Sequence, residues 1–118
     1  MTARKILLAE DEPLLRELTS EDLRDAGHTV ACAENGDVAL QILEQEFFEV
    51  LLTDIRMPGS LDGWELARTA RARWPEIKVV YLSGYSAEGL QPVPGGRFLK
   101  KPCRLEDLLR VLDELAEA

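Results

Sequence analysis

The chain has 118 residues, of which 46% are hydrophobic and 31% are charged, a composition typical of one folded globular domain and not of a disordered or fibrous protein. Its formal net charge of -8 argues against general binding to nucleic acid, whose phosphates attract lysine and arginine. The charge suits protein partners or a cation site, although solubility alone would also explain it. No stretch approaches the ~20 apolar residues of a membrane span, and no secretion signal opens the chain, so we expect a cytoplasmic protein.

Short apolar runs alternate with helical patterns along the first half of the chain. We predict strands at residues 5–9, 29–32 and 50–53. A helix is expected to begin at Pro13 and to stop at Gly27, and a second helix to begin at Asn35-Gly36. Cys32 and the distant Cys103 lack the spacing of a metal-binding pair, so we expect two reduced, packed thiols in preference to a disulfide or a metal site.

The second half continues the alternation with one irregular segment. Asp62 and Glu65 have the spacing of a capping box, and the helix that they open should end by Pro75. A strand follows at 78–82. Residues 84–96 are rich in proline and glycine and can hold only a short helical turn around 86–90. A brief strand at 97–99 and an amphipathic helix complete the chain, the helix carrying Leu105, Leu108, Leu109, Leu112 and Leu115.

The strands are continuously apolar and alternate with helices, which predicts a parallel sheet covered on both faces. Because crossovers between parallel strands are right-handed, the fold class is α/β, an open doubly wound sandwich. No repeat or linker interrupts the chain, so residues 1–118 should form one domain.

Polar side chains stand at the carboxyl ends of the predicted strands, where open α/β sheets bind their ligands. They are Glu10, Asp11 and Glu12 after the first strand, Asp54 after the third, Ser83 after the fourth, and Lys100 and Lys101 after the fifth. Any one of them alone would be an ordinary loop residue, and Glu12 is best explained as the N-cap of the next helix. Their joint placement instead indicates one site.

Several carboxylates close together repel one another unless a cation lies among them. Oxygen ligands without histidine or cysteine favour Mg²⁺, which keeps positions open for phosphate oxygens. The pattern therefore indicates phosphoryl transfer, with Asp54 as the nucleophile, Ser83 as a hydrogen-bond donor to phosphate and Lys101 neutralising charge. Two rival classes fit less well. A haloacid-type phosphatase needs a second acid where this chain has Arg56. A P-loop nucleotide-binding protein needs the glycine-rich phosphate-binding sequence G-x-x-x-x-G-K-[ST], which does not occur in this chain.

Four segments, in order, now resemble the motifs of one family: "ILLAEDEPLLR", "LLTDIRMPGSLDGWEL", "VVYLSGYS" and "FLKKP". Over essentially its whole length the chain resembles the receiver domain of two-component response regulators. The resemblance implies a flavodoxin-like, five-stranded parallel sheet in the order 2-1-3-4-5, with the fourth helix shortened here.

The resemblance also assigns roles at the metal site. It implies that Asp54 is the phosphoacceptor and that Glu10 and Asp11 form the acidic pair. Asp11 and Asp54 would bind Mg²⁺ directly, Glu10 would act through water, and the backbone carbonyl of Arg56 would be a further ligand. Glu10 stands where the family more often has aspartate, and the "MPGSLDG" loop is one residue longer than usual.

The remaining roles concern the switch. Ser83 corresponds to the switch hydroxyl, Lys101 to the family's lysine and Phe98 to the switch aromatic. The Lys101–Pro102 peptide would be cis, and Lys100 should point to the opposite side of its strand. Arg56 and Tyr85 would flank the site and influence hydrolysis.

The implied function is phosphorelay signal transduction. A histidine kinase or a His-containing phosphotransfer protein would phosphorylate Asp54 with Mg²⁺, and the surface at residues 84–99 would change. Such a switch assists its own phosphorylation and dephosphorylation but is not an enzyme with a separate substrate. It would bind no nucleic acid directly and no membrane. The alternative is a receiver-like interaction module that is not phosphorylated. The chain would be a stand-alone regulator, an expectation that its ends favour modestly, or part of a hybrid kinase.

Overall fold

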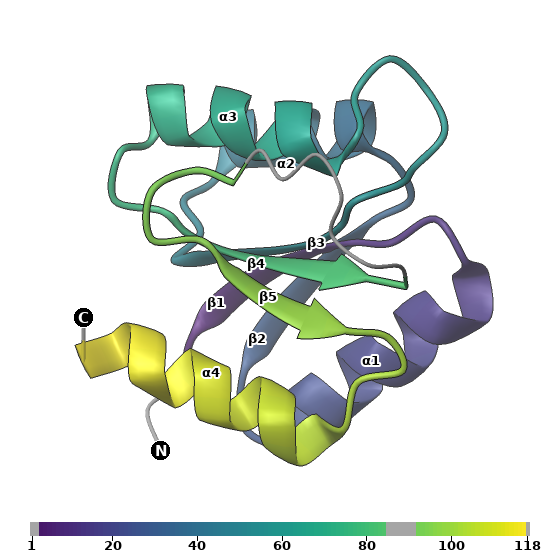
Figure 1. Cartoon of the computed structure of the whole chain (residues 1–118), viewed down its shortest axis with the longest axis vertical. Coiled ribbons are helices and arrows are strands. Elements are labelled where there is room, and N and C mark those ends of the chain that lie inside the picture. The colour runs from purple at the N-terminus through teal and green to yellow at the C-terminus, as the bar shows by residue number, and fades with distance from the viewer. Residues whose placement is uncertain (1–2, 85–91, 118) are drawn as a thin grey trace.

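A single parallel sheet forms the centre of the molecule in the computed structural model, which describes residues 3–84 and 92–117. Its five strands have the order β2-β1-β3-β4-β5 (Figure 1). The strands are β1 (Lys5–Ala9), β2 (Thr29–Ala33), β3 (Val50–Asp54), β4 (Lys78–Ser83) and β5 (Arg97–Lys100). The predicted fold class and strand order are confirmed.

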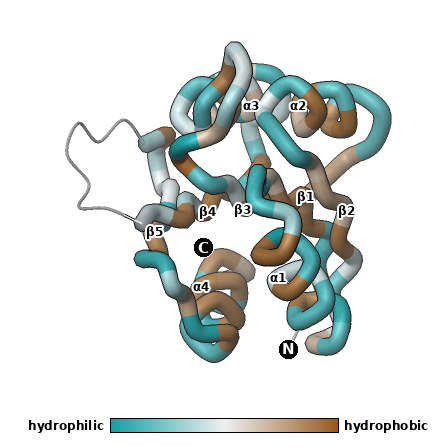
Figure 2. Tube along the Cα trace, turned by 90° about the vertical axis from the view of Figure 1, so that its right-hand side faces the viewer, coloured by the Kyte–Doolittle hydropathy of each residue, from teal (hydrophilic) through white to brown (hydrophobic). Residues whose placement is uncertain are grey.

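Two pairs of helices cover the two faces of the sheet. The helices are α1 (Pro13–Asp25), α2 (Gly36–Gln45), α3 (Gly63–Arg73) and α4 (Leu105–Glu117). In Figure 1, α2 and α3 lie above the sheet and α1 and α4 below it. Two hydrophobic clusters fill the layers between helices and sheet, and Figure 2 shows the hydrophobic character of the strands between them. None of these four helices is long and apolar enough to cross a membrane.

Helix boundaries follow the local signals in the sequence. The side chain of Asn35 accepts a hydrogen bond from the Val38 backbone N–H at 2.8 Å, and Asp62 accepts one from that of Glu65 at 2.9 Å. Gly27 follows α1 with φ +100°, a conformation that favours glycine. Glu12 occupies the N-cap position of α1 as predicted, but its side chain makes no capping hydrogen bond.

Four of the five strands run one residue further toward their carboxyl ends than the apolar pattern predicts. As a result Asp54 is the last residue of β3, paired with Leu82, and Ser83 is the last residue of β4, paired with Lys100. The sheet itself therefore fixes the backbone of both residues, which the sequence placed in loops.

Between β4 and β5, described residues 92–96 form a tight turn and no helix. Gly95 has φ +78°, and the Gly96 N–H donates to the Val93 carbonyl at 2.9 Å. The short helical turn expected around residues 86–90, and Tyr85, lie outside the described residues. Cys32 and Cys103 are both free thiols, as predicted.

Candidate functional site

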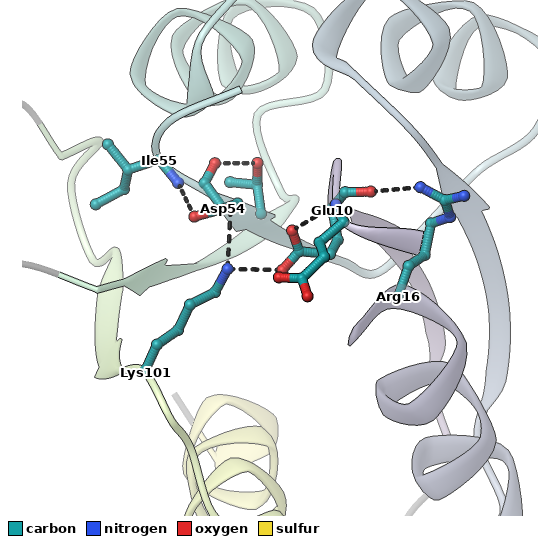
Figure 3. A network of polar contacts seen from close by, with 7 residues as sticks. Glu10, Arg16, Asp54, Ile55 and Lys101 are labelled. Atoms are coloured by element: carbon teal, nitrogen blue, oxygen red, sulfur yellow. Dashed lines mark hydrogen bonds and ion pairs between the residues drawn. The ribbon is translucent and has the colours of Figure 1, made fainter. Parts of the chain in front are cut away.

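Acidic side chains converge at the carboxyl ends of two neighbouring strands, β1 and the central strand β3. Glu10, Asp11 and Asp54 each offer a carboxylate oxygen, and these three oxygens lie within 4.8 Å of one another. Lys101, which follows β5, points its ammonium between Glu10 and Asp54 (Figure 3). The structure thus brings together side chains that are far apart in the sequence, as the strand-end pattern predicted.

Asp54 is held firmly at the end of β3. Its Oδ1 accepts a hydrogen bond from the Ile55 backbone N–H at 3.0 Å, and its Oδ2 accepts one from Lys101 Nζ at 2.9 Å. Its backbone carbonyl accepts from the Thr53 hydroxyl at 2.8 Å. Only 9% of the residue is exposed. The bonds from Ile55 and Lys101 therefore fix the orientation of the Asp54 carboxylate.

Glu10 is almost completely buried, with 1% exposed. Its Oε1 accepts from Lys101 Nζ at 2.7 Å, and its Oε2 accepts from the Glu12 backbone N–H at 3.2 Å. Burial raises the pKa of Glu10, and the nearby charge of Asp54 acts in the same direction, while the bond from Lys101 opposes both. Burial alone would lower the pKa of Lys101, but its hydrogen bonds to Glu10 and Asp54 raise it above the usual value. The side chain of Lys101 therefore stays protonated and positively charged in this site.

Three carboxylates converge at this edge, and those of Glu10 and Asp54 share the ammonium of Lys101. Oxygen-only ligands at this separation, with Asp11 exposed and Asp54 slightly so, fit a hard divalent cation that keeps open coordination positions. The acidic cluster fits metal binding on the chemistry of its donors.

The three residues predicted to form the switch lie on or directly after the last two strands: Ser83 ends β4, Phe98 lies in β5, and Lys101 follows β5. The Ser83 backbone carbonyl accepts from the Lys101 N–H at 2.7 Å, which joins the ends of β4 and β5. The Lys101–Pro102 peptide is cis, as predicted. Phe98 is 37% exposed, and its ring lies 5.1 Å from that of Tyr81 and 5.8 Å from that of Trp64, centroid to centroid.

Lys100 is exposed, in contrast to the partly buried Lys101. Whether the Arg56 carbonyl binds a metal stays a prediction, as does any role for Tyr85.

Sequence reasoning missed two residues that shape the site. Gly63, the first residue of α3, donates its N–H to the Ile55 carbonyl at 2.7 Å. A Cβ at this position would lie 2.2 Å from the Asp54 carbonyl oxygen, so only glycine lets α3 begin this close to the end of β3. Arg16 of α1 donates from Nη1 to the Glu10 carbonyl at 2.9 Å. The Asp-Gly step before α3 was the only sequence signal for Gly63, and Arg16 had none.

Comparison with known proteins identifies the family. The family model "Response regulator receiver domain" matches residues 6–113. The response regulator receiver protein CpdR of Brucella abortus is 37% identical over 116 residues, which cover 95% of this chain and 96% of CpdR. The sensor kinase CckA of the same organism is 35% identical, over 95% of this chain but only 12% of the kinase.

Solved structures agree. A response regulator receiver protein from Sinorhizobium medicae superposes with a TM-score of 0.92 and 34% identity, covering 98% of this chain and 96% of that one. The response regulator TrrA from Thermotoga maritima, solved in complex with Mg²⁺ and BeF, gives a TM-score of 0.87 with 30% identity, covering 95% and 98%.

This chain therefore belongs to the response regulator receiver domain family. Receiver domains of this family are phosphoacceptor switches, and the function of the chain is phosphorelay signal transduction.

Proposed function

We propose that Asp54 is the residue that accepts the phosphoryl group, in a reaction that depends on Mg²⁺. The observation that carries this proposal is the convergence of Asp54 with Glu10, Asp11 and Lys101 at one edge of the sheet. The donor is a histidine kinase or a His-containing phosphotransfer protein. A carboxylate oxygen of Asp54 forms the new bond to phosphorus, the phosphorus–nitrogen bond breaks, and its electron pair returns to the donor imidazole.

The acids and Lys101 have different roles: the acids would bind the metal ion, and Lys101 provides a positive charge beside Asp54. Asp11, Asp54 and the Arg56 carbonyl would hold Mg²⁺ directly, and Glu10 would do so through water. When bound, the ion neutralises negative charge on the transferred group. TrrA, a 30% identical receiver protein, was solved in complex with Mg²⁺ and BeF, which supports the same metal here. Lys101 already contacts Asp54 and provides the permanent positive charge.

The switch follows from the charge of the new group. A phosphoryl group brings a charge near -2 and three acceptor oxygens to the end of β3. The Ser83 hydroxyl and the Lys101 ammonium move toward it, and Phe98 fills the space beside Ser83. The surface at residues 84–99, of which 85–91 lie outside the described residues, is then the output.

Residues 1–118 form one receiver domain in the cytoplasm, with proteins as partners and without direct binding to nucleic acid or membrane. Related receivers occur within sensor kinases such as CckA and AruS, which supports a histidine kinase partner. The chain acts as a switch that assists its own phosphorylation and dephosphorylation and not as an enzyme with a separate substrate.

The test is the intact mass of the protein after incubation with acetyl phosphate or a phosphorylated kinase. With Mg²⁺ we expect a gain of one phosphoryl group, which is lost in Asp54→Asn and in the presence of a chelator. Asp25→Asn, at an exposed acid that ends α1, is the matched control and should gain the group normally. No gain in the wild type with either donor would overturn the proposal and leave the non-phosphorylated interaction module as the better explanation.

A further inference from the structure

Arg16 reaches from α1 to the backbone of the acidic segment. It is half-buried at the end of the first turn of the helix, and its Nη1 donates to the Glu10 carbonyl at 2.9 Å (Figure 3). A hydrogen bond from a charged donor is shorter and stronger than one between neutral groups. Arg16 therefore holds the connection between β1 and α1 at the residue that precedes Asp11.

The contact fixes one peptide plane. The Glu10 N–H donates to the Ala33 carbonyl at 3.0 Å, so the nitrogen side of this residue is held by β2. Arg16 holds its carbonyl side. Because a trans peptide is planar, the Asp11 N–H must point away from the Glu10 carbonyl, and hence away from Arg16. The backbone from which Asp11 extends its carboxylate is thus set by a guanidinium on α1.

We propose that Arg16 is a positioning residue of the cation site. It holds the Glu10–Asp11 peptide in the orientation at which the three carboxylates converge, and it touches neither the cation nor the phosphoryl group. This inference rests on the proposed function, since it places the cation among Glu10, Asp11 and Asp54. Residues that orient metal ligands without binding the metal typically contribute about 10- to 100-fold to metal affinity.

The same helix provides a matched control. Arg24 donates from Nη2 to the Val30 carbonyl at 2.9 Å, across the same separation of six residues as Arg16 and Glu10. Both arginines bind one backbone carbonyl of a neighbouring segment, but Val30 lies in β2, away from the acids. Arg24 is exposed and Arg16 half-buried, so their structural contributions can differ. A positioning role predicts that only the Arg16 substitution weakens cation binding.

The experiment measures Mg²⁺ affinity by calorimetry, without any phosphoryl donor, in the wild type, Arg16→Met, Arg24→Met and Arg16→Lys. We expect Arg16→Met to weaken Mg²⁺ binding about tenfold and Arg24→Met to change it less than about twofold. The unfolding temperature of each variant without metal is measured as well, so that a loss of affinity is distinguished from a loss of stability. Arg16→Lys keeps the charge and one donor, so it should recover part of the lost affinity. It also serves as the readout if Arg16→Met does not fold.

The outcomes separate the two proposals. Wild-type affinity in Arg16→Met, or in Arg16→Lys if only that variant folds, would overturn the positioning role while leaving the cation site intact. Equal weakening in Arg24→Met would also overturn it, because the effect would then be general. A wild-type protein that binds no Mg²⁺ would overturn the proposed function itself, and the inference with it.

Discussion

Charged side chains are arranged differently at the two ends of the sheet. At the amino end, three cations each pair with one acid: Arg4 with Glu49 at 3.6 Å, Lys5 with Glu46, and Arg97 with Glu114 at 2.7 Å. At the carboxyl end, Glu10 and Asp54 share the single ammonium of Lys101, and Asp11 adds a third carboxylate.

The difference indicates that the charged residues at the amino end serve mainly stability, whereas those at the carboxyl end form the candidate functional site. An exposed pair such as Arg97 and Glu114 contributes little to stability, typically ~0–1 kcal/mol. An excess of acid around a buried glutamate is unfavourable without a cation, and such clusters concentrate at functional sites. The three converging carboxylates at the carboxyl end therefore fit a divalent ion, which would neutralise part of their charge.

Glycines at the two ends allow the largest effect to be tested. At Gly63→Ala the new Cβ would meet the Asp54 backbone, so we expect the free energy of unfolding to fall by about 3 kcal/mol and phosphorylation to slow. Gly27→Ala, at the amino end, meets no described atom within 4 Å and is penalised only by its positive φ, about 1 kcal/mol. Chemical denaturation and phosphorylation rates would measure both. Equal losses, or normal phosphorylation in Gly63→Ala, would show that α3 does not position Asp54.

Removing one cation from each end of the sheet tests how differently the two ends depend on their positive charges. Lys101→Met leaves the buried Glu10 without its cation, so the metal-free protein should lose about 1–3 kcal/mol of stability, part of which added Mg²⁺ should restore. Arg97→Met breaks a pair whose side chains are 41% and 46% exposed, and should cost less than about 1 kcal/mol with or without Mg²⁺. Denaturation with and without Mg²⁺ provides the measurement. A Mg²⁺ response that is the same in both variants would contradict the difference between the ends.

A smaller effect is expected at His28, the buried histidine at the amino end. Its Nδ1 accepts from the Arg4 backbone N–H at 3.0 Å, which a protonated ring could not do. Burial, with the charge of Arg4, lowers the pKa of His28 below its usual 6.5. Just below pH 6.5, His28 therefore binds a proton more readily in the unfolded chain than in the folded one. The free energy of unfolding should therefore fall as the pH drops below about 6.5, by at most about 1.4 kcal/mol per pH unit.

His28→Asn keeps an acceptor for Arg4 but does not titrate, so the difference between it and the wild type isolates the histidine. Urea denaturation at about pH 7.5 and about pH 5.5 should show the smaller acid loss in the variant. Identical pH dependence in the two proteins would show that His28 is not responsible.

Much of this arrangement could be predicted because it depends on local patterns. Apolar periodicity located every described strand and helix, and the parallel order brought Asp54 and Lys101 together although 47 residues separate them. The predicted carboxyl ends of four strands are one residue short of those in the structure. Apolar character indicates burial, whereas a strand continues as long as its neighbour offers hydrogen bonds. That difference places Asp54 and Ser83 within the sheet.

The residues that were missed depend on how segments approach each other in the folded chain. Gly63 matters because the Asp54 carbonyl lies beside it, and Arg16 because the Glu10 carbonyl lies within its reach. Nothing in the spacing of these residues reveals either distance. Glu12 shows the converse limit: it occupies the N-cap position, but its backbone N–H bonds Glu10 and its side chain does not cap. Glutamate is not among the side chains that favour this role.

Of the acids at the carboxyl end, we propose that Asp54 alone takes the phosphoryl group. Borohydride reduction of the phosphorylated protein converts an aspartyl phosphate to homoserine, and peptide mass spectrometry then locates it. We predict homoserine at position 54 alone, and only when Mg²⁺ was present during phosphorylation. Modification at Asp11 or at another residue, or a label at position 54 that forms equally well in a chelator, would contradict this account.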